Sequence, residues 1–272
     1  MAKQTSFILK SFVMAATIIT FGILLFLIGY ILIKGVPYLT PSLFNMSYTS
    51  ENVSMFPSII NTVLMTLLSL MIAIPFGLFT AIYLVEYAKR GNKLVEIIRL
   101  TSETLAGIPS IVYGLFGMLF FVTYLGWGYS ILAGSATLSV MILPLIIRTT
   151  EEALKSVPDS YREASFGLGA GQLRTVFHIV LPSAVPGILA GVILAIGRIV
   201  GETAALIYTA GTVAKLPKDL LSSARTLSVH MYTLSSEGFH TNEAFATAVV
   251  LLIIVLLINT VSMVIARKVT KI

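Results

Sequence analysis

Long stretches without a charged residue dominate this chain and limit the folds open to it. The runs Ser11–Ile33, Asn52–Val85 and Thr104–Ile147 contain no Asp, Glu, Lys or Arg. A helix of about 20 residues crosses the apolar part of a lipid bilayer, so the longest run has room for two. With 57% hydrophobic and 11% charged residues, the chain has the composition of a polytopic membrane protein. We therefore expect an all-α fold with about six transmembrane helices.

Turn-forming and helix-breaking residues divide the chain into six spans. Pro75 and Gly77 predict a kink inside the second span, and Gly107 with Pro109 breaks the helical hydrogen bonding of the third. A tight turn at Tyr124–Tyr129 separates the third span from the fourth. The spans are predicted at about Phe12–Ile33, Ser58–Val85, Glu103–Val122, Ser130–Ile147, Ser183–Ala210 and Ala244–Ala266.

Basic residues are spread unevenly over the segments between these spans. If the N-terminus lies inside, the inner segments hold thirteen Lys and Arg residues and the outer segments hold four. Cytoplasmic loops carry the excess of basic residues, so both termini are predicted to be cytoplasmic. The inner set is Lys3, Lys10, Lys89, Arg90, Lys93, Arg99, Arg148, Lys155, Arg162, Arg174, Arg267, Lys268 and Lys271, and the outer set is Lys34, Lys215, Lys218 and Arg225.

The segment Glu163–Pro182, which this count places in the cytoplasm, is rich in small residues. Small side chains let another surface approach the backbone closely, and glycines allow a sharp turn between two short helices. We therefore expect a helix-turn-helix outside the bilayer that fits into a groove on a partner. Its small residues are Ala164, Ser165, Gly167, Gly169, Ala170 and Gly171.

The same segment resembles the signature loop of ABC-importer permeases, in which Glu-Ala-Ala is followed at fixed spacing by Gly, Ile and Leu-Pro. Ser165 departs from that pattern at the third small position. The resemblance implies that this loop couples to a separate ATPase and that the fold is that of a type I ABC importer permease. It also implies an additional N-terminal helix and outer linker at 1–57, and a permease domain at 58–272 with its coupling loop at 151–182. The matching positions are Glu163, Ala164, Gly169, Ile179, Leu181 and Pro182.

Two charged residues, Arg198 and Glu202, lie inside the predicted fifth span. A charge in the middle of a bilayer costs about 3 kcal/mol, and the i, i+4 spacing places both on one helical face. Arg198 could donate to an oxyanion, while Glu202 could accept from a hydroxyl of protonated phosphate and would repel sulfate. A structural ion pair within the bundle is the alternative. The same face carries small residues that allow close packing or leave room for a path, namely Gly187, Gly191, Ala195, Ala205 and Thr209.

Three further segments resemble the phosphate-specific subfamily of these permeases, and its A-type more than its C-type subunit. The resemblance implies one subunit of an ATP-driven importer of inorganic phosphate in the cell (inner) membrane of a prokaryote. It implies a substrate path at Arg198 and Glu202, in which we also place Thr203. The implied partners are a second related permease, two copies of a cytoplasmic ATP-binding subunit, an external phosphate-binding protein and membrane lipid. The segments are Ala106–Gly114, Gly197–Gly211 and Arg225–Gly238.

Several other kinds of chemistry lack their sequence signatures. The chain has no G-x-x-x-x-G-K-[ST] loop, no H-E-x-x-H motif and no cysteine, and its three histidines are scattered. We expect no ATP hydrolysis in this chain, no metal or cofactor, and no nucleic-acid partner. The alternatives are an ABC permease for another oxyanion or small polar solute, or an ATPase-independent secondary transporter. An integral-membrane enzyme would need a cluster of catalytic polar residues that the sequence does not offer.

Overall fold

The computed structural model describes residues 2–89 and 91–270, and within these ranges every regular element is a helix. Five helical stretches are long and apolar enough to cross a membrane, and a bent pair raises the number to six, which confirms the predicted fold class. The long helices are α1 Ala2–Gly35, α2 Phe56–Ile82, α5 Ile131–Lys155, α8 Leu181–Gly201 and α11 Thr241–Thr270, and the bent pair is α3 Lys93–Ala106 with α4 Ser110–Gly117. Shorter helices are α6 Asp159–Gly167, α7 Gln172–Thr175, α9 Ala204–Ile207 and α10 Leu227–Glu237.

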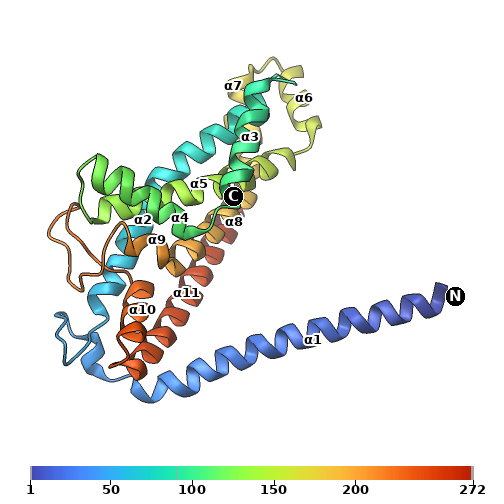
Figure 1. Cartoon of the computed structure of the whole chain (residues 1–272). Helices are drawn as coiled ribbons and strands as arrows, with labels where there is room; N and C mark the ends of the chain where they lie inside the picture. Colours follow the sequence, from blue (N-terminus) through green and yellow to red (C-terminus); the bar gives the residue numbers. More distant parts are fainter. Residues whose placement is uncertain (1, 90, 271–272) are drawn as a thin grey trace.

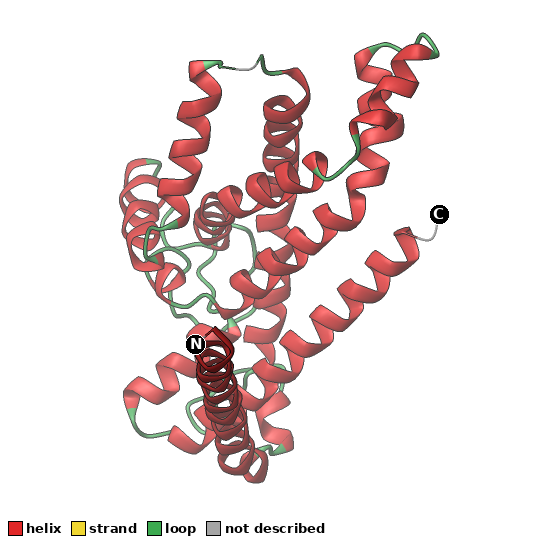
Figure 2. Cartoon of the chain, turned by 90° about the vertical axis from the view of Figure 1, so that its right-hand side faces the viewer, coloured by secondary structure: helices red, strands yellow, loops and turns green. Residues whose placement is uncertain are grey.

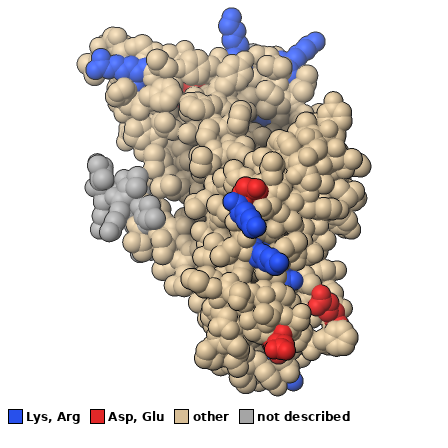
Figure 3. Space-filling model, turned by 90° about the vertical axis from the view of Figure 1, so that its left-hand side faces the viewer, with Lys and Arg blue, Asp and Glu red and all other residues tan. Residues whose placement is uncertain are grey.

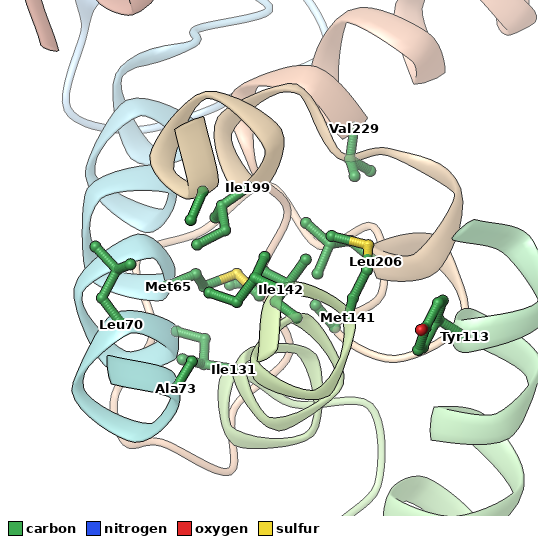
Figure 4. Packing of buried hydrophobic residues seen from close by; sticks show 14 of the residues in the cluster. Met65, Leu70, Ala73, Tyr113, Ile131, Met141, Ile142, Ile199, Leu206 and Val229 are labelled. Carbon is green, nitrogen blue, oxygen red and sulfur yellow. The ribbon is translucent and has the colours of Figure 1, made fainter. Parts of the chain in front are cut away.

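The main core lies where α2, α5 and α8 pack against one another (Figure 4). Met65, Met141, Ile142 and Leu206 are fully buried there. Side chains from distant parts of the chain interlock at this point, and because lipid is as apolar as the core, close van der Waals packing holds the helices together. The three helices therefore form a rigid framework for the groups described below.

The first helix, α1, stands apart from the bundle over most of its length (Figure 1), and in Figure 2 it is seen nearly end-on as it extends towards the viewer. No residue from 9 to 34 is buried, and most of the exposed side chains in this stretch are apolar. Near its C-terminal end, Tyr30 meets Phe245 of α11 edge-on with 5.8 Å between ring centroids. The predicted boundary between residues 1–57 and the rest of the chain stays a prediction.

The polar segments gather at two opposite ends of the bundle (Figure 1). One end carries α6 and α7, and the other carries α10 with the linker that follows α1. At this second end Leu43, Met55, Leu227 and Leu234 form a separate buried cluster. Figure 3 shows a largely uncharged face with basic side chains at its upper edge, the end that carries α6 and α7. Of the basic residues counted above, Arg90 and Lys271 lie outside the described residues.

The third span is sharply bent at the break that Gly107 and Pro109 predicted. Its two halves, Lys93–Ala106 and Ser110–Tyr124, meet at 105°. Pro109 has no N–H group and stands directly before α4, which explains the break at the predicted position. The first half also begins ten residues before the predicted start of the span at Glu103, because the Asn92 side chain accepts a hydrogen bond from the Leu94 amide and caps α3.

The fifth span was predicted to run from Ser183 to Ala210, and both ends are different. It begins at Gln172, since α7, a wide π-type turn at Val176–Val180 and α8 form one helical stretch. A wide turn tolerates the missing N–H of the following Pro182. The helix then ends at Gly201.

Candidate functional site

The predicted helix-turn-helix is present, and we call residues 159–181 the elbow. Gly169 has a φ of +82°, a left-handed conformation that lets the chain turn after α6. The amide of Gly169 donates to the Phe166 carbonyl at 2.9 Å, and that of Ala170 donates to Ser165 at 3.1 Å. These bonds satisfy carbonyls at the end of α6, so the turn is well defined although it is exposed.

The elbow has a hollow of about 490 Å³ on its surface, which we call the elbow hollow. Three of the predicted coupling residues, Ala164, Ser165 and Gly169, line it. Glu163 is exposed nearby, whereas Leu181 packs inward against a buried cluster and Pro182 lies in the first turn of α8. The remaining lining residues are Tyr161, Leu168, Ala170, Arg174 and Ile179.

Ser165, the departure from the family pattern, has a structural partner. Its hydroxyl lies 2.8 Å from the hydroxyl of Thr175 on α7. An alanine at this position would lack that bond. The hydrogen bond joins the two arms of the elbow, so the departure strengthens the turn.

A charged contact that the sequence analysis missed holds the elbow to two spans. Arg162 of α6 donates from Nη2 to Glu86 Oε1 at 2.7 Å, and Glu86 stands at the end of the second span. Arg162 also donates to the carbonyl of Leu154 in the last turn of α5 at 3.0 Å, to that of Val157 just beyond it at 2.8 Å, and to the Asp159 carboxylate at 3.1 Å. The hydrogen bond to Glu86 raises the pKa of Arg162, which stays charged. The 76-residue separation of the pair gives no local sequence signal.

Arg198 lines a cavity of about 390 Å³ between α3, α5 and α8, which we call the Arg198 cavity. Among the described residues it forms no ion pair or hydrogen bond, so its donors are free to bind a ligand. The wall of the cavity is highly charged. It carries the cations Arg99, Arg148, Lys155 and Arg198 and the carboxylates Glu103, Glu151 and Glu152.

Glu202 and Thr203 do not line the Arg198 cavity. The helix ends at Gly201, and among the described residues no ion pair joins Glu202 to Arg198, so the alternative ion pair is wrong. The Glu202 carboxylate accepts from the Ala205 amide at 3.0 Å, and its carbonyl accepts from Ser228 at 2.6 Å. Thr203 lines a different, mostly apolar groove beside α10 and α11. Their place in a substrate path stays a prediction.

The small residues of α8 serve close packing. A side chain at Gly187 would overlap Ala153, and one at Gly191 would overlap Thr149, both on α5. Gly197, further along, has open space around it. Of the two predicted uses of these small residues, the structure therefore supports close helix packing at Gly187 and Gly191.

The opposite end of the molecule holds a buried polar cluster. Arg225 is 4% exposed, and its guanidinium lies 4.7 Å from the centre of the Tyr48 ring. The neighbouring His230 on α10 is fully buried. Burial, and secondly the charge of Arg225, lower the pKa of His230 to about 3. Asn61 of α2 donates to the Arg225 carbonyl at 3.1 Å, so the cluster joins the second span to the outer segment.

Comparison with known proteins gives consistent matches along most of the chain. A probable ABC transporter permease of Bacillus subtilis, YqgI, is 37% identical over 88% of this chain and 87% of its own length. The phosphate transport system permease protein PstA of Pasteurella multocida is 36% identical over 83% of this chain and 81% of its own. A chain of a bacterial alginate ABC transporter superposes with a TM-score of 0.68 at 16% identity, covering 96% of both chains, and shows the same fold.

The family match covers most of the bundle and the elbow. It extends over residues 73–271 and so includes the second half of α2 and everything that follows up to the end of the described chain. The predicted ABC permease fold is confirmed by this match and by the solved structure. This multi-pass membrane protein belongs to the family of binding-protein-dependent transport system inner membrane components.

Proposed function

We propose that this chain is the permease subunit of an ATP-driven importer of inorganic phosphate. The observation that identifies phosphate as the proposed substrate is the similarity to a phosphate transport system permease protein, at 36% identity over 83% of the chain. Arg198, unpaired in a charged cavity, supports the same reading because a guanidinium offers a planar set of donors suited to phosphate. The chain would form half of the path and carry no catalytic site.

The proposal includes the partners that such a system needs. A second related permease completes the path, two copies of a cytoplasmic ATP-binding subunit engage the elbows, and an external protein delivers phosphate. The open elbow hollow, with the exposed Leu168 in its lining and the exposed Leu173 on α7 of the same elbow, supports docking of a separate subunit, since a hollow edged by apolar side chains gives a partner surface to bury. Both termini and the elbow then lie in the cytoplasm of a prokaryotic cell, as the distribution of basic residues predicts.

The test is uptake of labelled phosphate by vesicles that contain the purified complete transporter. We expect uptake that requires internal ATP, the ATP-binding subunit and the external binding protein. Sulfate in excess should leave uptake unchanged, whereas competition by sulfate would favour a permease for oxyanions in general. Uptake that persists without the ATP-binding subunit would contradict the proposal and favour a secondary transporter.

A further inference from the structure

Two neighbouring cavities share charged side chains in their linings. The first is the Arg198 cavity. The second has a volume of about 550 Å³ and is lined by Glu86, Arg162 and Gln172 at the base of the elbow, and we call it the Arg162 cavity. Arg99 of α3 and Lys155 at the end of α5 line both. These two cations therefore stand between Arg198 and the elbow end of the protein.

The two cations share one carboxylate. Arg99 Nη2 and Lys155 Nζ each lie 2.6 Å from the same atom, Glu151 Oε1. The Glu151 side chain is 11% exposed, and the buried Nε of Arg99 has no hydrogen-bond acceptor. The two cations and the single carboxylate give this site a net positive charge, and the Nε–H of Arg99 remains available as a hydrogen-bond donor. Such a site attracts an anion more than a fully neutralised network would.

The other charges of the Arg198 cavity do not cancel this surplus. Arg148 pairs with Glu152 at 3.1 Å, and both side chains are mostly exposed. Glu103 and the unpaired Arg198 contribute one charge of each sign to the same cavity. The cavity therefore carries one cation more than it has carboxylates, and its most enclosed ion pair is the one at Glu151.

We propose that Arg99 and Lys155 form a release site for the transported oxyanion and that Glu151 keeps its affinity low. The inference rests on the proposed function. An anion that leaves Arg198 would displace the Glu151 carboxylate from Arg99 and Lys155. When the anion departs, the carboxylate would pair with the two cations again. A site on a transport path must bind well enough to admit the ion and weakly enough to let it go, and a built-in competing carboxylate supplies that balance. The competing explanation is a structural tie between α3 and α5 that never contacts the substrate.

A cysteine reporter can test this site, because the chain has no cysteine of its own. Ser102 lines the Arg198 cavity and is partly exposed. In the complete transporter, Ser102→Cys would be treated with a sulfonate thiol reagent at increasing inorganic phosphate, with ionic strength held constant by chloride. The modified fraction of this chain is read by mass spectrometry. The measured quantity is the phosphate concentration that halves the modification rate.

The two explanations predict different signs. For a release site, Arg99→Gln raises the half-protecting phosphate concentration and Glu151→Gln lowers it, each by roughly tenfold, since one removes a ligand and the other a competitor. Lys93 is exposed, lies on α3 like Arg99 and does not line the Arg198 cavity, so Lys93→Gln should leave the half-protecting phosphate concentration unchanged. For a structural tie, Arg99→Gln and Glu151→Gln break the same contact and must shift protection in the same direction, which would overturn the proposal.

A second variant and an uptake measurement distinguish failure of the release site from failure of the proposed function. Lys155→Gln preserves the contact between Arg99 and Glu151, so it serves where Glu151→Gln fails to assemble, and it should act in the same direction as Arg99→Gln. ATP-driven phosphate uptake by the unsubstituted transporter is measured alongside. Uptake with protection that none of the variants changes would refute the release site alone, whereas the absence of both uptake and protection would refute the proposed function.

Discussion

The guanidinium of Arg162 and the carboxylate of Glu86 join the elbow to the end of the second span. Their closest atoms are 2.7 Å apart, and the two side chains are only 15% and 7% exposed. Gln172, at the start of α7, donates to the backbone carbonyl of the same Glu86. Because both arms of the elbow are held to one residue, a force on the elbow reaches α2 and α5 without passing through a flexible linker.

Removing this contact should destabilise the protein and uncouple it. A buried charge left without its partner costs on the order of 3 kcal/mol, so Arg162→Gln should lower the thermal midpoint in detergent. Glu86→Gln should do the same, and the double variant should lose less than the sum of the two single losses. Arg174→Gln, at an exposed basic residue of the same elbow, is the control for stability and should leave the thermal midpoint nearly unchanged. Additive losses in the double variant would show that the two residues act separately.

The left-handed turn at Gly169 should tolerate asparagine better than a branched residue. A side chain there meets open space, so only the backbone conformation opposes it, at about 1–2 kcal/mol. We expect Gly169→Val to abolish ATP-driven uptake and Gly169→Asn to retain part of it. Gly171→Val tests the interpretation, since Gly171 has an ordinary extended backbone and open space around it. Equal loss at both positions would point to a steric requirement of the docking partner instead.

Two glycines on α8 should respond to alanine with opposite signs. Gly191→Ala places a methyl group against Thr149 of α5 and should lower the thermal midpoint, because overpacking costs about 1–3 kcal/mol. Gly197→Ala meets nothing within 4 Å and should raise it slightly, since alanine favours the helix by about 0.5–1 kcal/mol. Scanning fluorimetry of the two variants in the same detergent compares them. A lower midpoint for Gly197→Ala would mean that another subunit packs on that face.

Stability should fall in acid because of His230. Its pKa is about 3 in the folded protein and 6.5 in an unfolded chain, so between these values the unfolded chain binds more protons. The contribution is complete above pH 6.5 and is lost as the pH falls towards 3, with a slope of up to about 1.4 kcal/mol per pH unit. His230→Gln should flatten the decline of the thermal midpoint between pH 6.5 and 4. His178→Gln, at an exposed histidine, should leave the curve as it is.

Arg198 should be needed for transport and dispensable for assembly. We expect Arg198→Gln to remove most phosphate uptake while the complex still purifies with all its subunits, because the side chain has no ion pair or hydrogen bond with any described residue. Arg198→Lys should retain part of the uptake, since lysine keeps the charge and loses the planar fork. Normal uptake by Arg198→Gln would remove this residue from the path.

The sequence predicted those features that rest on local chemistry. Uncharged runs located the spans, Pro109 located the break in the third, and the glycines after α6 located the turn of the elbow. Each of these follows from the residue type itself, since a proline cannot donate and a glycine reaches the left-handed region at low cost. The family resemblance was confirmed by the match over residues 73–271.

What the sequence did not predict depends on partners far away in the chain. The helix ends at Gly201, and the next residue, Glu202, accepts two hydrogen bonds: its carbonyl accepts from the Ser228 hydroxyl, and its carboxylate accepts from the Ala205 amide of the next short helix. The i, i+4 spacing with Arg198 does not predict either bond. Arg162 was counted only among the basic residues of a cytoplasmic segment, and Glu86 was not singled out. Both cases need tertiary contacts that periodicity cannot report.

The uninterrupted helix from Gln172 to Gly201 joins the elbow to Arg198 in one piece. At 1.5 Å per residue its 30 residues span about 45 Å, so a tilt of about 10° around its middle would displace its two tips by about 4 Å in opposite senses. Such a tilt would move the elbow and Arg198 together, because no flexible segment separates them along this helix.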